Sequence, residues 1–144
     1  MKKTLLFPFI SCALCGYASA QQPTARAMVE SGSTAYLKDG ASAAVGAWLK
    51  GSALEGNTQA TSQANSLRQI EDFYGKPEGI ELISESAISK RSKVILAVIN
   101  YEKGPVFARF FSYQLKNGNW ILTEFKFQTE ANLIFPEQVL YRRE

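Results

Sequence analysis

Histidine is absent from the 144-residue chain, and its two cysteines, Cys12 and Cys15, both lie within the first twenty residues. A protein released from that segment would contain neither residue type, so Ser-His-Asp and Cys-His nucleophile systems are nearly excluded. The usual ligand sets for transition metals are excluded for the same reason, and no disulfide is expected in the released part. We therefore expect a domain that folds without a cofactor, a metal or a cross-link.

The first twenty residues contain the three parts of a cleavable secretory signal. Two lysines follow Met1, an apolar and uncharged stretch covers residues 5–17, and the small residues Ala18 and Ala20 precede Gln21. The apolar stretch is shorter than the roughly 20 residues that a membrane-spanning helix needs, so no permanent membrane anchor is expected. The sequence predicts cleavage after Ala20 and a periplasmic location for residues 21–144.

Two alternatives compete with this prediction. A buried N-terminal helix would contain Pro8 in its interior and two lysines before it, which makes it the weaker interpretation. Lipidation of Cys12 or Cys15 requires a small residue just before the cysteine, and only Ser11 meets that requirement. Cleavage after Ala20 is therefore the favoured interpretation.

Charge is nearly balanced in the predicted mature chain. Loss of Lys2 and Lys3 with the signal lowers the basic side chains from 16 to 14 against 13 acidic ones, which gives a net charge of +1 over 124 residues. A near-neutral domain lacks the basic surface that binds nucleic acid or anionic membranes. Neither a G-x-G-x-x-G nor a G-K-[ST] string occurs, so nucleotide binding is not indicated. The length suffices for a single domain with one core.

Helices are predicted in the first half of the mature chain, which is rich in Ala, Gly, Ser and Thr. One helical stripe comprises Ala41, Ala44, Val45, Trp48 and Leu49. Asp39 is predicted to cap the start of this helix, and Gly51 suits its end. An earlier helix is expected over residues 25–37, although Ser31-Gly32-Ser33-Thr34 interrupts its apolar pattern.

A third helix is predicted from Ser62 to Tyr74. Its apolar residues recur at helical spacing, Thr61 or Ser62 can cap its start, and Gly75 is typical of a helix end. Residues 51–60, between the second and third helices, contain small polar residues and two glycines and are predicted to form a loop.

Strands are predicted in the second half, where β-branched and aromatic residues dominate. Residues 80–85 alternate in character, a turn at Lys90-Arg91 follows, and the unbroken apolar run at residues 94–99 suits a strand covered on both faces. A long strand to about Lys116 comes next, and Asn117-Gly118 predicts a type I′ hairpin.

A two-residue loop at Asn117-Gly118 would determine which residues of the last two strands face each other. The expected pairs on one face are Leu115 with Trp120, Tyr113 with Leu122, Phe111 with Glu124 and Arg109 with Lys126. The expected pairs on the other face are Ser112 with Thr123, Phe110 with Phe125 and Ala108 with Phe127. Both faces are then largely apolar, so the second one must form a pocket or a dimer interface, or be covered by the first helix and the C-terminal tail.

The order of elements and four short strings resemble small secreted bacterial members of the NTF2-like superfamily. The strings are Ala47-Trp48-Leu49-Lys50-Gly51-Ser52, Phe73-Tyr74-Gly75, Asn100-Tyr101-Glu102-Lys103-Gly104-Pro105 and Asn117-Gly118-Asn119-Trp120. The resemblance implies one α+β domain over residues 21–144, in which N-terminal helices pack on a curved antiparallel sheet of about four strands, an NTF2-like or cystatin-like cone. It also implies frequent dimerisation through the sheet and a cavity at the open end. Because this fold serves enzymes, ligand carriers and inert scaffolds alike, it leaves the activity open.

The leading candidate site is a group of charged residues on one face of the predicted hairpin, Arg109, Glu124 and Lys126. Arg109 and Lys126 are expected opposite each other beside Phe111 and Tyr113, and burial of such charges is costly unless they are paired or used. The cluster predicts either a pocket floor that holds an acidic small ligand or a surface salt bridge whose stems pack on aromatic rings. The salt bridge is the favoured interpretation.

Other residues carry weaker signals. Tyr101, Tyr113 and Trp120 could line a cavity, although aromatic residues in strands usually belong to a core or an interface. The basic residues at 90–93 and at Arg142-Arg143 are better explained as solvated surface.

The leading functional hypothesis is non-enzymatic binding of a small apolar or amphipathic ligand or of a protein partner, with a homodimer expected. One alternative is a cofactor-free isomerase or hydratase that uses Glu124 with Tyr113. Another is an accessory subunit of an envelope assembly that docks through the apolar face of the sheet. A carrier requires a cavity, an enzyme requires a carboxylate within it, and an accessory subunit requires an exposed patch.

Overall fold

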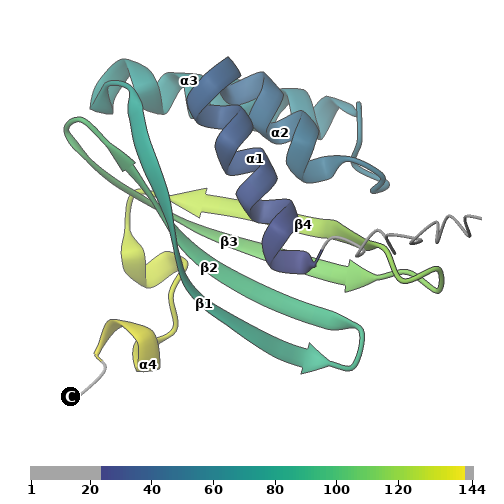
Figure 1. The fold of residues 1–144 in the computed structure, drawn as a ribbon. Coiled ribbons are helices and arrows are strands. Elements are labelled where there is room, and N and C mark those ends of the chain that lie inside the picture. Colours follow the sequence, from purple (N-terminus) through teal and green to yellow (C-terminus); the bar gives the residue numbers. More distant parts are fainter. Residues whose placement is uncertain (1–23, 142–144) are drawn as a thin grey trace, which may run out of the picture.

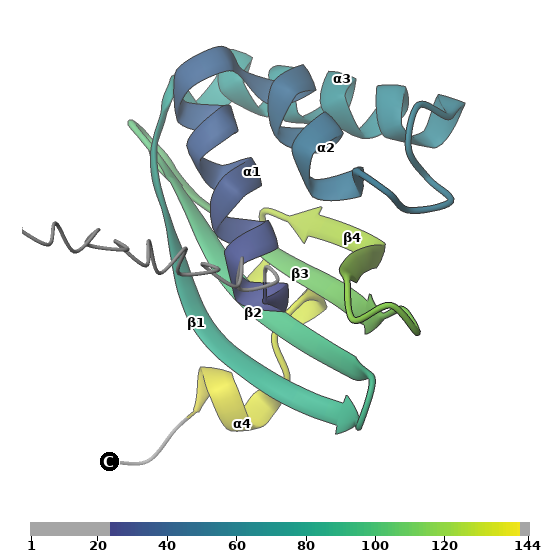
Figure 2. The ribbon, with the colours of Figure 1, turned by 45° about the vertical axis from the view of Figure 1, so that its right-hand side comes forward.

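The computed structural model describes residues 24–141, in which three helices precede a four-stranded antiparallel sheet (Figure 1). The predicted signal, its cleavage site and Arg142-Arg143 lie outside the described residues. The helices are α1 (Ala25–Asp39), α2 (Ala41–Leu49) and α3 (Thr58–Tyr74). The strands are β1 (Pro77–Ser89), β2 (Ser92–Tyr101), β3 (Gly104–Gln114) and β4 (Trp120–Gln128), followed by η1 (Ala131–Leu133) and α4 (Glu137–Leu140). The predicted α+β class, with helices packed on a curved antiparallel sheet, is confirmed (Figure 2).

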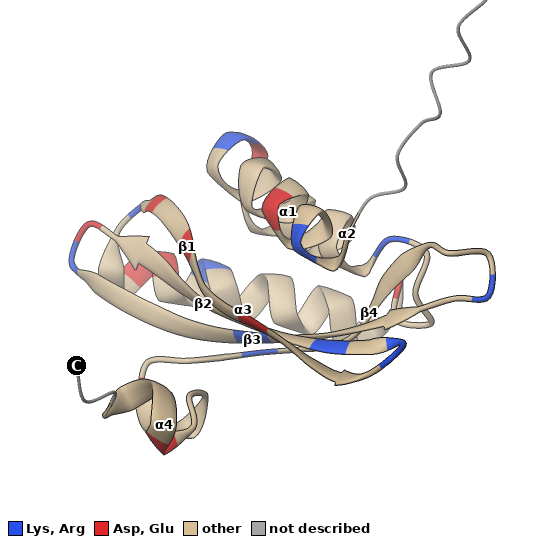
Figure 3. Cartoon of the chain, turned by 60° about the horizontal axis from the view of Figure 1, so that its bottom comes forward, with Lys and Arg blue, Asp and Glu red and all other residues tan. Residues whose placement is uncertain are grey.

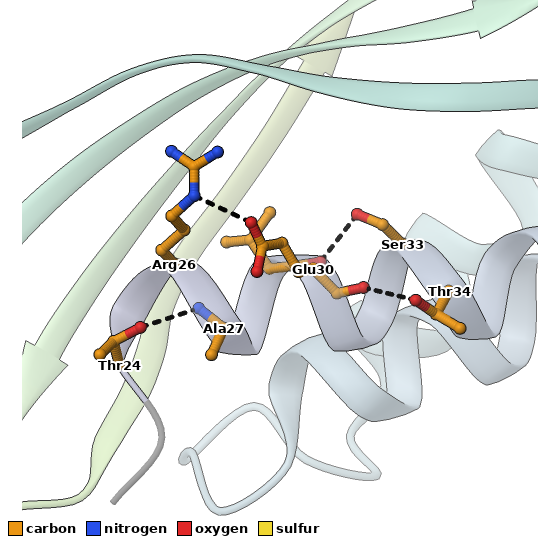
Figure 4. Close-up of polar contacts among 7 residues, drawn as sticks. Thr24, Arg26, Ala27, Glu30, Ser33 and Thr34 are labelled. Atoms are coloured by element: carbon orange, nitrogen blue, oxygen red, sulfur yellow. Dashed lines mark hydrogen bonds and ion pairs between the residues drawn. The ribbon is translucent and has the colours of Figure 1, made fainter. Parts of the chain in front are cut away.

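The Ser31-Gly32-Ser33-Thr34 string does not interrupt α1. The hydroxyls of Ser33 and Thr34 donate to carbonyls one turn earlier in the helix, at 2.7 and 3.0 Å (Figure 4). These bonds satisfy both hydroxyls without removing the backbone from the helix. Thr24 caps the helix start, because its hydroxyl accepts a hydrogen bond from a backbone amide of the first turn at 3.1 Å. The expected helix over residues 25–37 is confirmed.

Gly40 forms the junction between α1 and α2. Its φ is 84°, and its amide donates to the carbonyl of Tyr36. The predicted cap at Asp39 is wrong, because Asp39 is the last residue of α1 and Gly40 occupies the N-cap position of α2 without a side-chain bond. Gly40 is the only residue between the two helices, so Asp39 is still helical and its carboxylate cannot cap α2. The predicted apolar stripe is confirmed, because its members are all buried: Ala41, Ala44, Val45, Trp48 and Leu49.

The third helix begins earlier than predicted. It starts at Thr58, and Asn57 is its cap, because the Asn57 carboxamide oxygen accepts a backbone amide of the first turn at 2.9 Å. The predicted caps, Thr61 and Ser62, therefore lie inside the helix, and the predicted loop loses its last three residues to α3. The predicted end is confirmed, since Gly75 has a φ of 83° and its amide donates to the last turn.

The sheet is a meander in the order β1-β2-β3-β4. The predicted turn at Lys90-Arg91 is confirmed between β1 and β2. β2 lies in the middle of the sheet, and its apolar run is covered on both faces as predicted. Ile95, Ala97 and Ile99 are buried on the side of the helices, and Leu96 is buried on the opposite side.

The hairpin between β3 and β4 differs from the prediction near its tip. Gly118 has a φ of 89°, whereas the non-glycine residues among 24–141 all have negative φ, so the turn is not of type I′. The Leu115 amide donates to the Asn119 carbonyl at 2.8 Å and closes a three-residue loop. The longer loop offsets the pairing by one residue, and a bulge at Thr123 restores the predicted register from Phe111 toward the start of β3. The observed pairs near the tip are Ser112 with Leu122, Tyr113 with Ile121 and Gln114 with Trp120. The predicted pairs that they replace are Ser112 with Thr123, Tyr113 with Leu122 and Leu115 with Trp120.

The main core lies between the helices and one face of the sheet, and Trp48 is at its centre. The Trp48 ring is fully buried and packs against Phe110 and Phe125, with ring centroids 5.2 and 4.7 Å apart. Its indole N–H donates to the carbonyl of Val29 in α1 at 2.9 Å. Gly32, one turn further along α1, gives this ring room, because a Cβ at that position would lie 2.1 Å from it.

The opposite face of the sheet carries a second, smaller core. Residues 131–140, which we call the C-terminal strap, cross this face while the three helices cover the other one (Figure 3). Ile134 and Phe135 of the strap are buried against Leu96, and the rings of Phe135 and Phe107 meet edge to face at 5.3 Å. The sequence correctly predicts two apolar faces, and the strap covers part of the second.

The two edge strands are irregular or obstructed. β1 has three breaks of register against β2, at residues 78, 83 and 88. On the other edge, the side-chain amide of Gln63 in α3 donates to the main-chain carbonyl of Phe125 in β4 at 3.0 Å. Within residues 24–141, no helix is both long and apolar enough to cross a membrane.

Candidate functional site

An open groove of about 500 Å³ lies on the strap side of the sheet. Its floor is formed by β1, β2 and β3, and its wall is formed by the strap. The lining residues are Ser84, Ser86, Ile88, Val94, Leu96, Arg109, Phe111, Asn132, Leu133, Ile134, Phe135, Pro136 and Val139. The lining is mostly apolar and contains one charged residue, Arg109.

The sheet register explains why these side chains meet. β2 and β3 pair Leu96 with Arg109 and Val94 with Phe111, and paired residues point to the same face. A bulge in β1 at Ile83 moves the following side chains by one position, so that Ser84 pairs with Leu96 and points to the strap side. The β1 part of the floor thus consists of Ser84, Ser86 and Ile88.

Arg109 lies on the groove floor with its side chain 28% exposed. Its guanidinium carbon lies 5.3 Å from the ring centroid of Phe111, as in a cation–π contact. A terminal guanidinium nitrogen lies 3.7 Å from a carboxylate oxygen of Glu124, which is an ion-pair distance but too long for a hydrogen bond. The Nε–H of Arg109 is buried and has no hydrogen-bond partner within the part of the chain that the structure describes.

Glu124 and Lys126 lie beside the groove and not in its lining. The ammonium of Lys126 lies 3.4 Å from the same Glu124 oxygen that faces Arg109. The predicted opposition of Arg109 and Lys126 is therefore present, with Glu124 diagonal to Arg109 and two residues before Lys126 on the same strand. The favoured interpretation, a salt bridge, is present, and of its three residues Arg109 alone also lines the groove.

Tyr101 and Tyr113 do not join this cluster. Tyr113 lies toward the hairpin tip, where the guanidinium of Arg91 covers its ring at 4.6 Å. Tyr101 lies on the helix side of the sheet, is 4% exposed, and shares a hydrogen bond of 2.8 Å with the Tyr36 hydroxyl. The proposed pairing of a carboxylate with a tyrosine thus has no counterpart in the groove lining.

Tyr36 and Tyr101 form a buried pair whose pKa values are both shifted. Burial raises the pKa of Tyr36, and its hydrogen bond to Tyr101 raises that pKa further. Burial also raises the pKa of Tyr101 to about 12, although its hydrogen bond to Tyr36 acts in the opposite direction. The carboxylate of Glu71 raises both pKa values through its charge. Both tyrosines belong to the main core and neither lines the strap-side groove, so this pair supports the core.

A second pocket of about 420 Å³ lies between α1, α2 and the tip of the β3–β4 hairpin. Trp120 contributes to its lining, and Lys93 lies over the Trp120 ring at 5.1 Å and pairs with Glu85 at 2.5 Å. The Lys93 ammonium therefore already contacts both an aromatic ring and a carboxylate. The polar residues of this pocket are Ser31, Lys50 and Asn119.

The sequence analysis missed the strap residues of the groove. Leu133-Ile134-Phe135 is an apolar string after a polar stretch, and that contrast is a usable signal of a segment packed on the sheet. No cluster of three or more acidic, histidine or cysteine residues suited to a metal is present among residues 24–141. No protein-family model, curated protein or solved structure matches the chain.

Proposed function

We propose that this protein is a non-enzymatic binding domain of the periplasm, and that the groove between the sheet and the C-terminal strap holds one small amphipathic ligand. The groove itself is the observation that carries this proposal. Its volume of about 500 Å³ falls within the range of about 300 to 1,000 Å³ that is usual for small-molecule sites. An apolar lining with one polar anchor is also typical of such sites.

The helix side of the sheet is a poorer candidate because its centre is already filled. Trp48, Phe110 and Phe125 are buried there in mutual contact. On the strap side, Ile88 and Leu133 line the groove and are 58% and 55% exposed. Large apolar side chains that remain exposed beside a groove favour a binding role.

Two further parts of the proposal rest on features described above. Three helices on one face of a curved four-stranded sheet support an NTF2-like arrangement. The lysines, apolar stretch and small residues within residues 1–20 support export. The isomerase or hydratase alternative is less well supported, because no acidic residue belongs to the groove lining.

The test uses two matched variants in the same strand. Ile88 lines the groove, whereas Ile83 is also exposed, at 39%, but does not line it. We expect the wild-type protein to bind the neutral fluorescent dye Nile red with increased emission. Ile88→Gln should weaken dye binding by about threefold to tenfold, because apolar contact area is lost, and Ile83→Gln should leave it unchanged. Absence of dye binding, or equal losses in the two variants, would contradict the proposal.

A further inference from the structure

The lining of the strap-side groove carries a positive charge and no negative one. Arg109 is the only charged residue among those that line it, and the remainder of the lining is apolar apart from Ser84, Ser86 and Asn132. A ligand that fills this groove would cover the Arg109 guanidinium and remove it from water. Covering an arginine is costly unless an anionic or hydrogen-bonding group meets it.

The existing partner of Arg109 does not satisfy it. Glu124 lies 3.7 Å away and is shared with Lys126 at 3.4 Å, so two cations face one carboxylate. The Arg109 Nε–H is buried without a hydrogen-bond partner among the described residues. Phe111 lies against the guanidinium at 5.3 Å and restricts its orientation. The site therefore has an excess positive charge and an unused donor at a fixed position.

We propose that the occupant of the groove is a single-chain amphiphile with a carboxylate head, of the fatty-acid class. This inference rests on the proposed function and adds the chemistry of the ligand. A carboxylate matches the planar donors of an arginine and can accept hydrogen bonds from its exposed terminal N–H groups. The alkyl chain extends from Arg109 over Leu96 toward Phe135 and Val139, where the strap supplies apolar contacts.

The test compares two ligands of equal chain length, decanoate and decanol, by displacement of Nile red from the full mature protein. Decanoate should bind about tenfold more tightly than decanol, because it alone makes a charge-assisted hydrogen bond to Arg109. Arg109→Gln should remove this difference. Lys103→Gln is the control for net charge, since Lys103 is exposed in the turn between β2 and β3 and lies outside the groove lining; it should retain the difference.

Glu124→Gln provides a measurement that does not depend on removing the arginine. Without the competing carboxylate, decanoate should bind about twofold to threefold more tightly, while decanol binding stays the same. Equal affinity for decanoate and decanol in the wild-type protein would overturn the carboxylate inference and leave the groove as a binding site for neutral apolar ligands. Failure of the Ile88→Gln variant to weaken Nile red binding would instead refute the proposed function. Decyl sulfate that binds as decanoate does, with loss of both in Arg109→Gln, would extend the head group to other anions and overturn the restriction to carboxylates.

Discussion

Gly32→Ala provides the sharpest test of the packing of α1 against α2. Helix propensity alone predicts that this change stabilises the protein by about 1 kcal/mol, because alanine is the better helix former. The structure predicts the opposite. A Cβ at position 32 would lie 2.1 Å from two atoms of the Trp48 ring and 2.6 Å from a third, and this ring is fully buried between α1 and the sheet.

The expected loss of stability comes from two costs of displacing the Trp48 ring. Overpacking of a tight core costs about 1 to 3 kcal/mol. Displacement of Trp48 also breaks its hydrogen bond to the Val29 carbonyl and leaves a buried N–H unpaired, at a cost of about 1 to 3 kcal/mol. After the gain in helix propensity is subtracted, Gly32→Ala should lower the free energy of unfolding by about 1 to 5 kcal/mol.

Gly46→Ala is the matched control. Gly46 lies in α2, and nothing lies within 4 Å of a Cβ built there, so only propensity acts. This variant should raise the free energy of unfolding by up to about 1 kcal/mol. Urea unfolding followed by far-ultraviolet circular dichroism measures both variants. A Gly32→Ala protein as stable as the wild type would show that the Trp48 ring does not pack on α1 as described.

Two further predictions concern the tyrosine pair and export. Because the pKa of Tyr101 is raised from 10.0 to about 12, the unfolded chain loses this proton first, and stability should fall by about 1.4 kcal/mol per pH unit between those values. Tyr36, whose pKa is also raised, should steepen this loss of stability with pH, and Tyr101→Phe should make it shallower. Urea unfolding midpoints from about pH 8 to pH 12 measure both effects, and a stability that does not change with pH would contradict the buried pair. If residues 1–20 are a cleaved signal, the intact mass of protein recovered from the periplasm should correspond to a chain that begins at Gln21, and a retained Met1 or a lipid-modified cysteine would refute export by this route.

Periodicity accounts for most of the fold that could be predicted from the sequence. The stripe from Ala41 to Leu49 and the apolar run at residues 94–99 each determine an element and the way it is buried. The errors concern local competition between hydrogen-bonding residues. Asn57 caps α3 in preference to Thr61 or Ser62, and this choice depends on where the chain leaves α2 rather than on cap preference alone.

The turn at Asn117-Gly118 shows a second limit of prediction. This dipeptide favours a two-residue loop, but the hairpin uses a three-residue loop and compensates with a bulge at Thr123. The pair Arg109–Lys126 lies beyond the bulge and was therefore predicted correctly. A slip confined to the hairpin tip does not disturb the site, because the bulge absorbs it.

The sequence could predict the site residues on the β3–β4 hairpin but not those on the C-terminal strap. Alternation places Arg109 and Phe111 on one face, and the burial cost of a charge makes Arg109 noticeable. The contribution of Phe135 depends on a chain reversal after β4 that no short pattern specifies. Tyr101, for which the sequence left a cavity or a core position open, is buried in the core, where its partner Tyr36 lies 65 residues away in α1.

The irregular edges of the sheet bear on edge-to-edge aggregation. A strand as apolar as β2 could template the growth of a larger sheet if its neighbours offered straight, unpaired edges. The three breaks of register in β1 present an uneven row of amides and carbonyls to an incoming strand. At the β4 edge, the Gln63 side chain occupies a carbonyl that such a strand would need. Both edges are therefore poor templates for an added strand, which protects a very apolar sheet from edge-to-edge aggregation.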